Sequence, residues 1–208
     1  MKPITHLAIL ALLALGVSSC VTAQGEVQAG RRDLLYGDPN HAVVRFQNAA
    51  AANPDALYFS YMPEGVWTYV GRAYYQSGRL PEARQALERA VARSSDDSLA
   101  RLYLGLTLAR EGDRPGGLKN IESGLTGIHS WLDYLENRLP YGAGRYWDPR
   151  KEIRGEIRLQ LATIGPNVNW PRLIAGSEWV GRQMEEEIER ARFDERQEYR
   201  LEGEGKQP

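Results

Sequence analysis

Small residues return along this chain at a fixed interval, and this repetition constrains the fold more than any other feature. Within 67–131, a glycine preceded by an apolar residue recurs after 34 positions, from Gly71 to Gly105. In both copies apolar residues stand three or four positions apart, as on one face of a helix. A further glycine, Gly78 or Gly112, is placed to end the first helix of a pair. The pattern predicts helical hairpins that stack on one another.

Three copies of the pattern can be aligned. The second copy, 64–97, is the fullest, and its recurring residues are Trp67, Val70, Gly71, Tyr74, Gly78, Ala83, Leu87 and Ala90. The third, 98–131, keeps Leu104, Gly105, Leu108, Gly112 and Ile121. It has Gly117 and Gly124 in place of the two alanines, and each costs a helix about 1 kcal/mol relative to alanine. The first, 23–56, matches through Gly30, Gly37, Ala42, Phe46, Ala49 and Pro54.

These residues resemble the tetratricopeptide repeat (TPR), whose pattern reads W-x2-L-G-x2-Y followed by alanine, a large apolar residue and alanine. Val70 replaces the family's leucine, Arg101 replaces the tryptophan of the third copy, and Ser95 stands at the closing proline. The resemblance implies an all-α, TPR-type α-solenoid of about three helix-turn-helix repeats within 20–131. Small side chains would then lie where two helices approach closely.

Seven residues, 57–63, interrupt the period between the first and second repeats. Four of them are aromatic or methionine, namely Tyr58, Phe59, Tyr61 and Met62. We expect them to pack beneath the junction of the repeats. The alternative is an aromatic lip at the edge of a groove.

After the repeats, 132–200 keeps helical spacing without the period, and we expect a helical extension that caps the end of the solenoid. Asp148 and Pro149 suit the N-cap and first position of one helix. Asn169-Trp170-Pro171 suits the start of the last helix.

From Glu185 onward this last helix is densely charged. Such a sequence favours a solvated helix over a coiled-coil partner site. The final residues, 201–208, are expected to be disordered. The tryptophan-rich C-terminal segment leaves a homodimer open.

The start of the chain reads as a secretory signal that ends in a lipid-attachment motif. Lys2 precedes an apolar run over 7–15, which is too short to span a bilayer. Val17-Ser18-Ser19-Cys20 resembles the bacterial lipobox, and Cys20 is the one cysteine of the chain. The resemblance implies removal of 1–19, acylation of Cys20 (as by palmitate) and anchoring in a membrane. Val21, in place of aspartate, favours the outer membrane facing the periplasm if the cell is Gram-negative. The alternative is an ordinary secretory signal.

Several classes of function lack support. A net charge of −1 gives no basic excess for nucleic acid. After residue 20 there is no cysteine, and His41 and His129 are too few for a zinc site. His129, Ser130 and Asp133 are the residue types of an acyl-transfer triad, but no glycine elbow surrounds the serine. Asp148, between aromatic residues, lacks the second carboxylate of a glycosidase. We expect a non-enzymatic chain with no cofactor and no metal.

The resemblance to TPR solenoids also implies a concave groove lined by the first helix of each repeat. By helical phase, the side chains that avoid the core there are Arg31, Thr68, Arg72, Tyr75, Gln76 and Arg110. Arg31 and Arg72 occupy equivalent places and can favour an acidic or C-terminal peptide. Alternatively they only solvate exposed helix faces. Tyr75 is the best aromatic anchor candidate.

These features together predict a lipid-anchored TPR scaffold of the bacterial cell envelope that binds a protein or peptide partner and no nucleic acid. The alternative is a cell-wall- or carbohydrate-binding envelope factor. That factor would use the aromatic segments 58–61 and 141–147.

Overall fold

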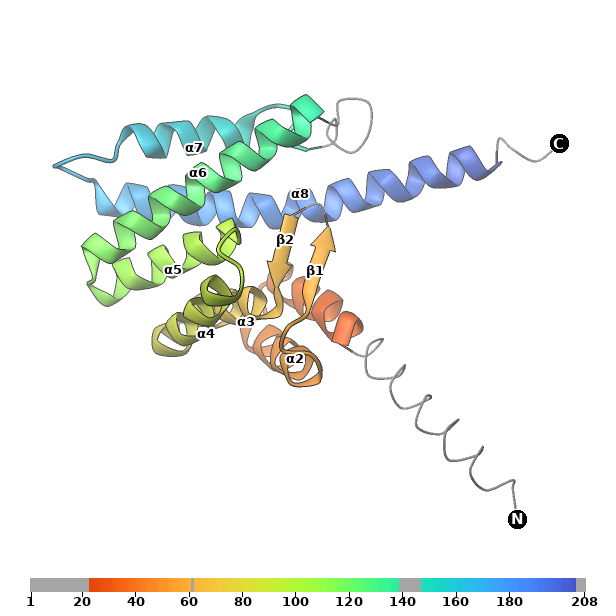
Figure 1. Cartoon of the computed structure of the whole chain (residues 1–208), viewed down its shortest axis with the longest axis horizontal. Helices are drawn as coiled ribbons and strands as arrows, with labels where there is room; N and C mark the ends of the chain where they lie inside the picture. The colour runs from red at the N-terminus through yellow and green to blue at the C-terminus, as the bar shows by residue number, and fades with distance from the viewer. Residues whose placement is uncertain (1–22, 61, 139–146, 205–208) are drawn as a thin grey trace, which may run out of the picture.

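The computed structural model describes residues 23–60, 62–138 and 147–204 (Figure 1). Within them the chain is helical apart from one short hairpin of strands. The helices cover 23–35, α2 Pro39–Ala52, α3 Val66–Gln76, α4 Leu80–Arg93, α5 Ser98–Glu111, α6 Arg114–Arg138, α7 Glu152–Ala162 and α8 Trp170–Glu204. The segment 1–19, which is predicted to be a secretory signal, and Cys20 lie outside the described residues. Among the described helices, none is both long and apolar enough to cross a bilayer.

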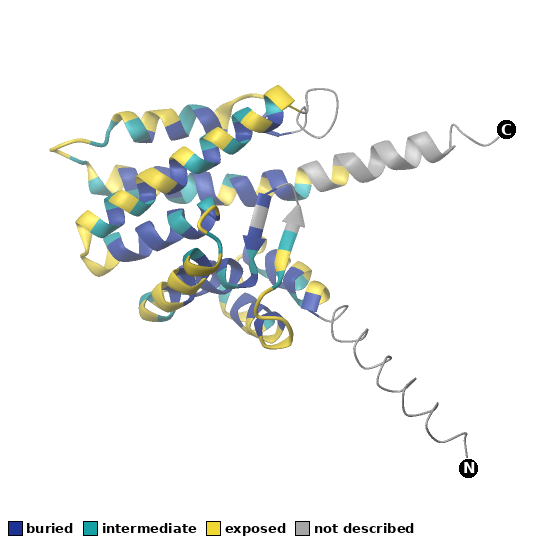
Figure 2. Cartoon of the chain, viewed as in Figure 1, coloured by how far each residue is buried: buried dark blue, intermediate teal, exposed yellow. Residues whose placement is uncertain are grey.

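The helices before residue 138 form three stacked hairpins, which confirms the predicted TPR-type solenoid. The helix over 23–35 pairs with α2, α3 pairs with α4, and α5 pairs with α6 (Figure 1). Successive hairpins touch through α2 against α3 and through α3 and α4 against α5. Buried residues line the inner faces of these helices, and exposed residues lie on their outer faces (Figure 2).

The recurring glycines lie where the two helices of each hairpin cross. A Cβ atom added at Gly71 would lie 2.4 Å from Leu87 Cγ, within the distance that real contacts avoid. The same clash would arise in the other two repeats, between Gly30 and Phe46 and between Gly105 and Ile121. Each glycine therefore sits opposite the large apolar residue sixteen positions later.

Two further glycines in α6 explain the departure of the third repeat from alanine. A Cβ atom at Gly117 would lie 2.9 Å from the backbone nitrogen of Ala109, and one at Gly124 would lie 2.6 Å from that of Leu102. The backbones of α5 and α6 approach too closely for alanine. The two glycines lower the helix propensity of α6, but they allow α5 and α6 to pack closely.

The interruption between the first two repeats is a β-hairpin, which the sequence analysis did not predict. Strands β1 Leu57–Ser60 and β2 Met62–Gly65 pair antiparallel, with Tyr58 opposite Glu64. A proline within β2, Pro63, weakens the strand signal because it cannot donate to the ladder. Met62 is buried and Tyr58 packs edge-on against Tyr69, as expected for residues beneath the junction.

The C-terminal helices return along the solenoid. Helix α7 packs against α6 and α8, and α8 also packs against α5. Helix α8 begins at Trp170, as predicted, and the side-chain oxygen Oδ1 of Asn169 accepts the Arg172 N–H at 3.2 Å. It continues to Glu204, into the segment expected to be a disordered tail, and 205–208 lie outside the described residues.

The predicted start of α7 at Pro149 is wrong, because this helix begins at Glu152. Asp148 adopts a left-handed backbone conformation (φ 44°), which takes it out of the helix. Its carboxylate still accepts the N–H groups of Ile153 and Arg154, both at 3.0 Å. Asp148 therefore caps α7 from one turn away.

Candidate functional site

The face of the solenoid on which the sequence analysis placed a binding groove is covered by the chain's own α8. Glutamates of α8 pair with side chains from the helix over 23–35, from α3 and from α5. Figure 1 shows α8 running past these elements along its first half. We call the covered surface, which includes Arg31, Arg72, Tyr75 and Arg110, the docking face.

Glu185 is the centre of this docking face. Its carboxylate accepts a hydrogen bond from Arg31 Nε and lies 2.8 Å from Arg72 Nη2. The side chains of Arg31, Arg72 and Glu185 are 1, 1 and 3 % exposed, respectively. Burial opposes ionisation of Glu185, but the two arginines outweigh it and lower the pKa of its carboxyl. Glu189, one turn further, lies 2.8 Å from Arg31 Nη2.

A second buried carboxylate enters this network from β2. Glu64 Oε2 lies 3.5 Å from Arg72 Nη1, and its side chain is 1 % exposed. Burial raises the pKa of Glu64 to about 7, against the opposing effect of Arg72, and the nearby Glu185 and Asp97 raise it further. The docking face therefore holds a carboxyl that titrates near neutral pH.

The other end of the docking face is more open. The Tyr75 hydroxyl donates to Glu178 Oε1 at 2.5 Å, and Arg110 Nη2 lies 2.5 Å from the same oxygen. The Arg110 guanidinium also lies over the Tyr75 ring, 4.6 Å from its centre. The side chain of Arg110 is 40 % exposed and that of Glu178 is 22 % exposed.

The structure thus brings four of the six residues predicted for the groove against α8: Arg31, Arg72, Tyr75 and Arg110. Of the other two, the Thr68 hydroxyl donates to Asp97, the N-cap of α5, and Gln76 is exposed at the end of α3. Arg31 and Arg72 are buried, so they do not solvate exposed helix faces. Contact of these six residues with a partner stays a prediction.

The glutamates that fill this face were not among the residues predicted for the site. The prediction of a solvated helix from Glu185 onward is wrong at Glu185 and Glu187, because these side chains are 2 and 5 % exposed. The signal that could have found them is the spacing of Glu178, Glu185 and Glu189, at seven and four residues, which places them on one helix face.

Helix α8 is packed into the hydrophobic core of the fold. Four apolar side chains along it, those of Leu173, Val180, Met184 and Ile188, are at most 1 % exposed. Burial of four such side chains contributes about 6–12 kcal/mol, which is comparable to the whole stability of a domain. Displacing α8 would expose these side chains, so a partner that binds the docking face has to compete with α8 for it.

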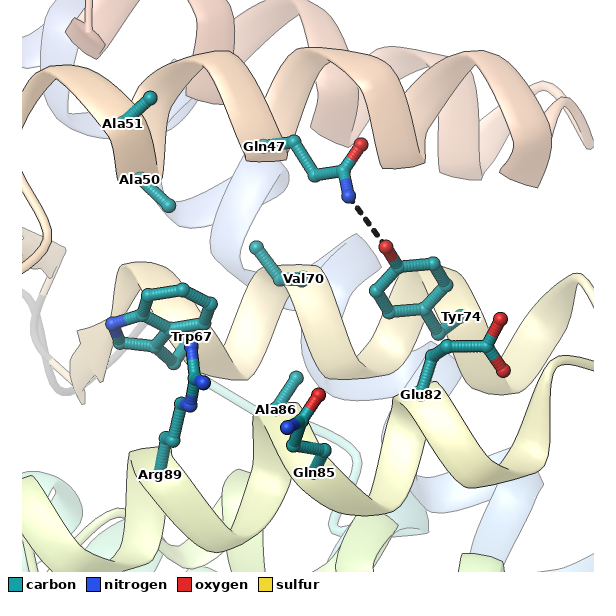
Figure 3. Close-up of a pocket in the computed structure, with 10 residues that line it drawn as sticks. All are labelled: Gln47, Ala50, Ala51, Trp67, Val70, Tyr74, Glu82, Gln85, Ala86 and Arg89. Carbon is teal, nitrogen blue, oxygen red and sulfur yellow. Dashed lines mark hydrogen bonds between the residues drawn. The ribbon is translucent and has the colours of Figure 1, made fainter.

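A groove lies on the opposite face of α3, between α2 and α4 (Figure 3). We call it the α3 groove. Its volume is about 340 Å³, and its lining residues are Gln47, Ala50, Ala51, Trp67, Val70, Tyr74, Glu82, Gln85, Ala86 and Arg89. Gln47 Nε2 donates to the Tyr74 hydroxyl at 2.5 Å, and the Arg89 guanidinium lies 4.9 Å from the centre of the Trp67 ring. A smaller cavity of about 170 Å³ shares Trp67 with it.

A third cavity, of about 520 Å³, lies between β2, α5 and α6. Trp131 and Tyr134 stack on one another at its edge, with ring centres 5.3 Å apart. Asp96 and Arg101 also line it, together with serines of both helices. Aromatic faces and hydroxyl groups therefore meet at one surface.

The groupings that suggested chemistry in the sequence have structural roles. His129 Nδ1 lies 3.1 Å from Asp133 Oδ2 one turn along α6, while Ser130 is exposed in the third cavity. Asp148 pairs with Arg154 at 3.1 Å, and both are 3 % exposed. Among the described residues no cluster of ligating side chains could hold a metal ion.

Two aromatic side chains from the segments of the carbohydrate alternative, those of Trp147 and Tyr58, are not open platforms. Trp147 is 2 % exposed, and Tyr58 packs against Tyr69. Tyr61 and 141–146 lie outside the described residues.

Comparison with known proteins supports the repeat. A family model described as tetratricopeptide repeat matches residues 64–107, which include α3, α4 and most of α5. Comparisons with curated proteins and with solved structures found no match. The matched segment contains the fullest copy of the sequence pattern, and it folds as the stacked hairpins that the pattern implies. Residues 64–107 are therefore a tetratricopeptide repeat segment within an all-α solenoid.

Proposed function

We propose that this chain is a non-enzymatic, lipid-anchored scaffold that binds a protein or peptide partner in the bacterial cell envelope. The TPR segment at 64–107 carries the proposal, because TPRs in general mediate protein–protein interaction. The lipobox-like sequence that ends at Cys20 supports the anchor. Confinement to a membrane surface raises the effective concentration of both molecules, so a weak contact suffices.

The anchor is tested by Cys20→Ser. The parent chain is expected to take up radioactive palmitate in bacteria and to sediment with membranes. The variant is expected to lose the label and to leave the membrane fraction, because two or more acyl chains are needed for stable attachment. A variant that sediments as the parent does would reject lipid anchoring.

Partner binding is tested with a photoreactive residue at one of three exposed positions, Gln76, Gln85 or Ser130. These positions lie at the end of α3, in the α3 groove and in the third cavity. We expect one protein to be captured in stoichiometric yield from at least one position, and its capture to fall with Cys20→Ser. Failure at all three positions would reject the scaffold function.

Carbohydrate binding is the second candidate function, and the third cavity favours it. Tyr134 is 49 % exposed and stacks on Trp131, so an aromatic face is available beside serine hydroxyls. If this candidate is right, Tyr134→Ala reduces retention of the full chain on purified peptidoglycan. The matched control is Tyr36→Ala, because Tyr36 is 86 % exposed and lies outside the cavity.

A further inference from the structure

We propose that the partner binds in the α3 groove as an extended peptide segment. A small apolar side chain of the partner lies on the alanine floor, and an adjacent acidic side chain meets Arg89. This inference rests on the proposed scaffold function and assigns its binding surface. That surface lies on the opposite side of α3 from the docking face that α8 closes.

The two faces of α3 differ in what covers them. Arg72 and Tyr75 point toward α8 and bind its glutamates. Trp67, Val70 and Tyr74, spaced at three and four residues, form the base of the α3 groove. One face is thus closed within the chain and the other is open.

The floor of the groove accepts a small apolar side chain. Ala50, Val70 and Ala86 bring only methyl groups to it, and Figure 3 shows Val70 and Ala86 between Trp67 and Tyr74, with Ala50 across from Trp67 on α2. These two aromatic residues are two helical turns apart, about 10 Å. This length matches about three residues of extended chain.

The walls favour an extended backbone over a helix. Gln47 from α2 and Gln85 from α4 are both exposed and lie on opposite sides of the groove (Figure 3). Each amide offers donors and an acceptor, and among the described residues one N–H of Gln47 is used, by Tyr74. An extended segment has free N–H and C=O groups along its edges, whereas a helix satisfies its own.

The charges in the groove favour an acidic partner. Arg89 is exposed and stacks on Trp67, and within the described part of the chain it has no ion pair. The neighbouring Arg93 is already paired with Asp55 at 2.8 Å. Glu82, at the Tyr74 end, is paired with Arg79 at 2.8 Å. The charge left for a partner is therefore the cation at Arg89.

The test titrates the isotope-labelled full chain, in detergent, with two blocked pentapeptides. One is acetyl-Thr-Val-Ala-Asp-Thr-amide, whose β-branched residues favour an extended backbone. The other has lysine in place of aspartate. We expect NMR shifts at the Trp67 indole N–H and at the side-chain amides of Gln47 and Gln85. The aspartate peptide should bind about two- to fivefold more tightly, as for an exposed ion pair.

Three variants make this test specific. Arg89→Glu should reverse the preference between the two peptides. Ala51→Tyr places a ring over the groove from an exposed position of α2 and should abolish binding. Arg84→Glu, on α4 but outside the groove, is the control and should change neither result.

The inference is overturned if neither peptide binds, if both bind equally, or if binding survives Ala51→Tyr. Its failure is distinguishable from failure of the scaffold function. Capture of a partner through Gln76 or Ser130, undiminished by Ala51→Tyr, would keep the scaffold and reject the groove. Capture from none of the three photoreactive positions would reject the scaffold itself.

Discussion

Single glycines set how closely the two helices of a repeat can approach. At Gly71 an added Cβ atom would meet three carbon atoms of the buried Leu87 at 2.4–3.3 Å. At Gly155, inside α7, the same atom would meet nothing within 4 Å. The same substitution therefore has opposite consequences at these two helical positions.

We expect Gly71→Ala to lower the free energy of unfolding by about 1–3 kcal/mol, because the core must move to admit the methyl group. Gly155→Ala should raise it by about 0.5–1 kcal/mol through the lower entropy of the unfolded chain. Urea denaturation of the full chain measures both. Equal effects of the two substitutions would contradict the role assigned to Gly71.

At the scale of elements, α8 is held to the repeats by charge as well as by apolar packing. Glu185 joins it to the helix over 23–35 through Arg31 and to α3 through Arg72. All three side chains are buried. Removing the charge of Glu185 is therefore strongly destabilising, because it leaves the two arginines buried without this counter-charge. The next residue, Glu186, is exposed and offers a matched comparison.

Glu185→Gln is expected to lower the free energy of unfolding by about 3–5 kcal/mol, since it leaves two buried arginines short of a counter-charge. Glu186→Gln should change it by less than about 0.5 kcal/mol. Chemical denaturation followed by circular dichroism gives both values. If the two variants were equally stable, Glu185 would not fasten α8.

At the scale of the whole molecule, the buried charges connect elements that are far apart in the sequence. Arg31, Glu64, Arg72 and Glu185 come from the first helix, β2, α3 and α8. Global unfolding separates all four. The pH dependence of stability therefore reports on this network.

Within this network, Glu64 gives the pH dependence of stability a predictable direction. Its carboxyl faces Arg72, Glu185, Asp97 and Tyr69, and burial raises its pKa from 4.5 to about 7. Between these values the folded chain binds a proton that the unfolded chain lacks, so stability falls as pH rises from about 4.5 to 7. The fall is on the order of 3 kcal/mol.

Glu64→Gln should remove this fall, because the amide does not titrate. Urea denaturation of the parent chain and the variant at several pH values from about 5 to 8 measures the difference. The difference in stability should grow in favour of the variant as pH rises. Parallel curves would show that Glu64 does not titrate in this range.

The repeats can be predicted from the amino-acid sequence alone. The positions of Gly30, Gly71 and Gly105 predict hairpins because each contact joins residues only sixteen apart, within one supersecondary unit. Helical phase also selected Arg31, Arg72, Tyr75 and Arg110 for one face of the solenoid. The periodicity of the sequence is enough to predict the hairpins and this face. The glycine contact within a hairpin and the direction of a side chain on a helix are both local properties.

The element that covers this face of the solenoid depends on contacts between residues far apart in the sequence. The Arg31–Glu185 contact joins residues 154 positions apart, and no period links them. The β-hairpin at 57–65 and the cap on α7 at Asp148 depend likewise on packing around them. A local sequence pattern indicates which residues can be buried. Which element packs over them depends on the free energy of the whole folded chain.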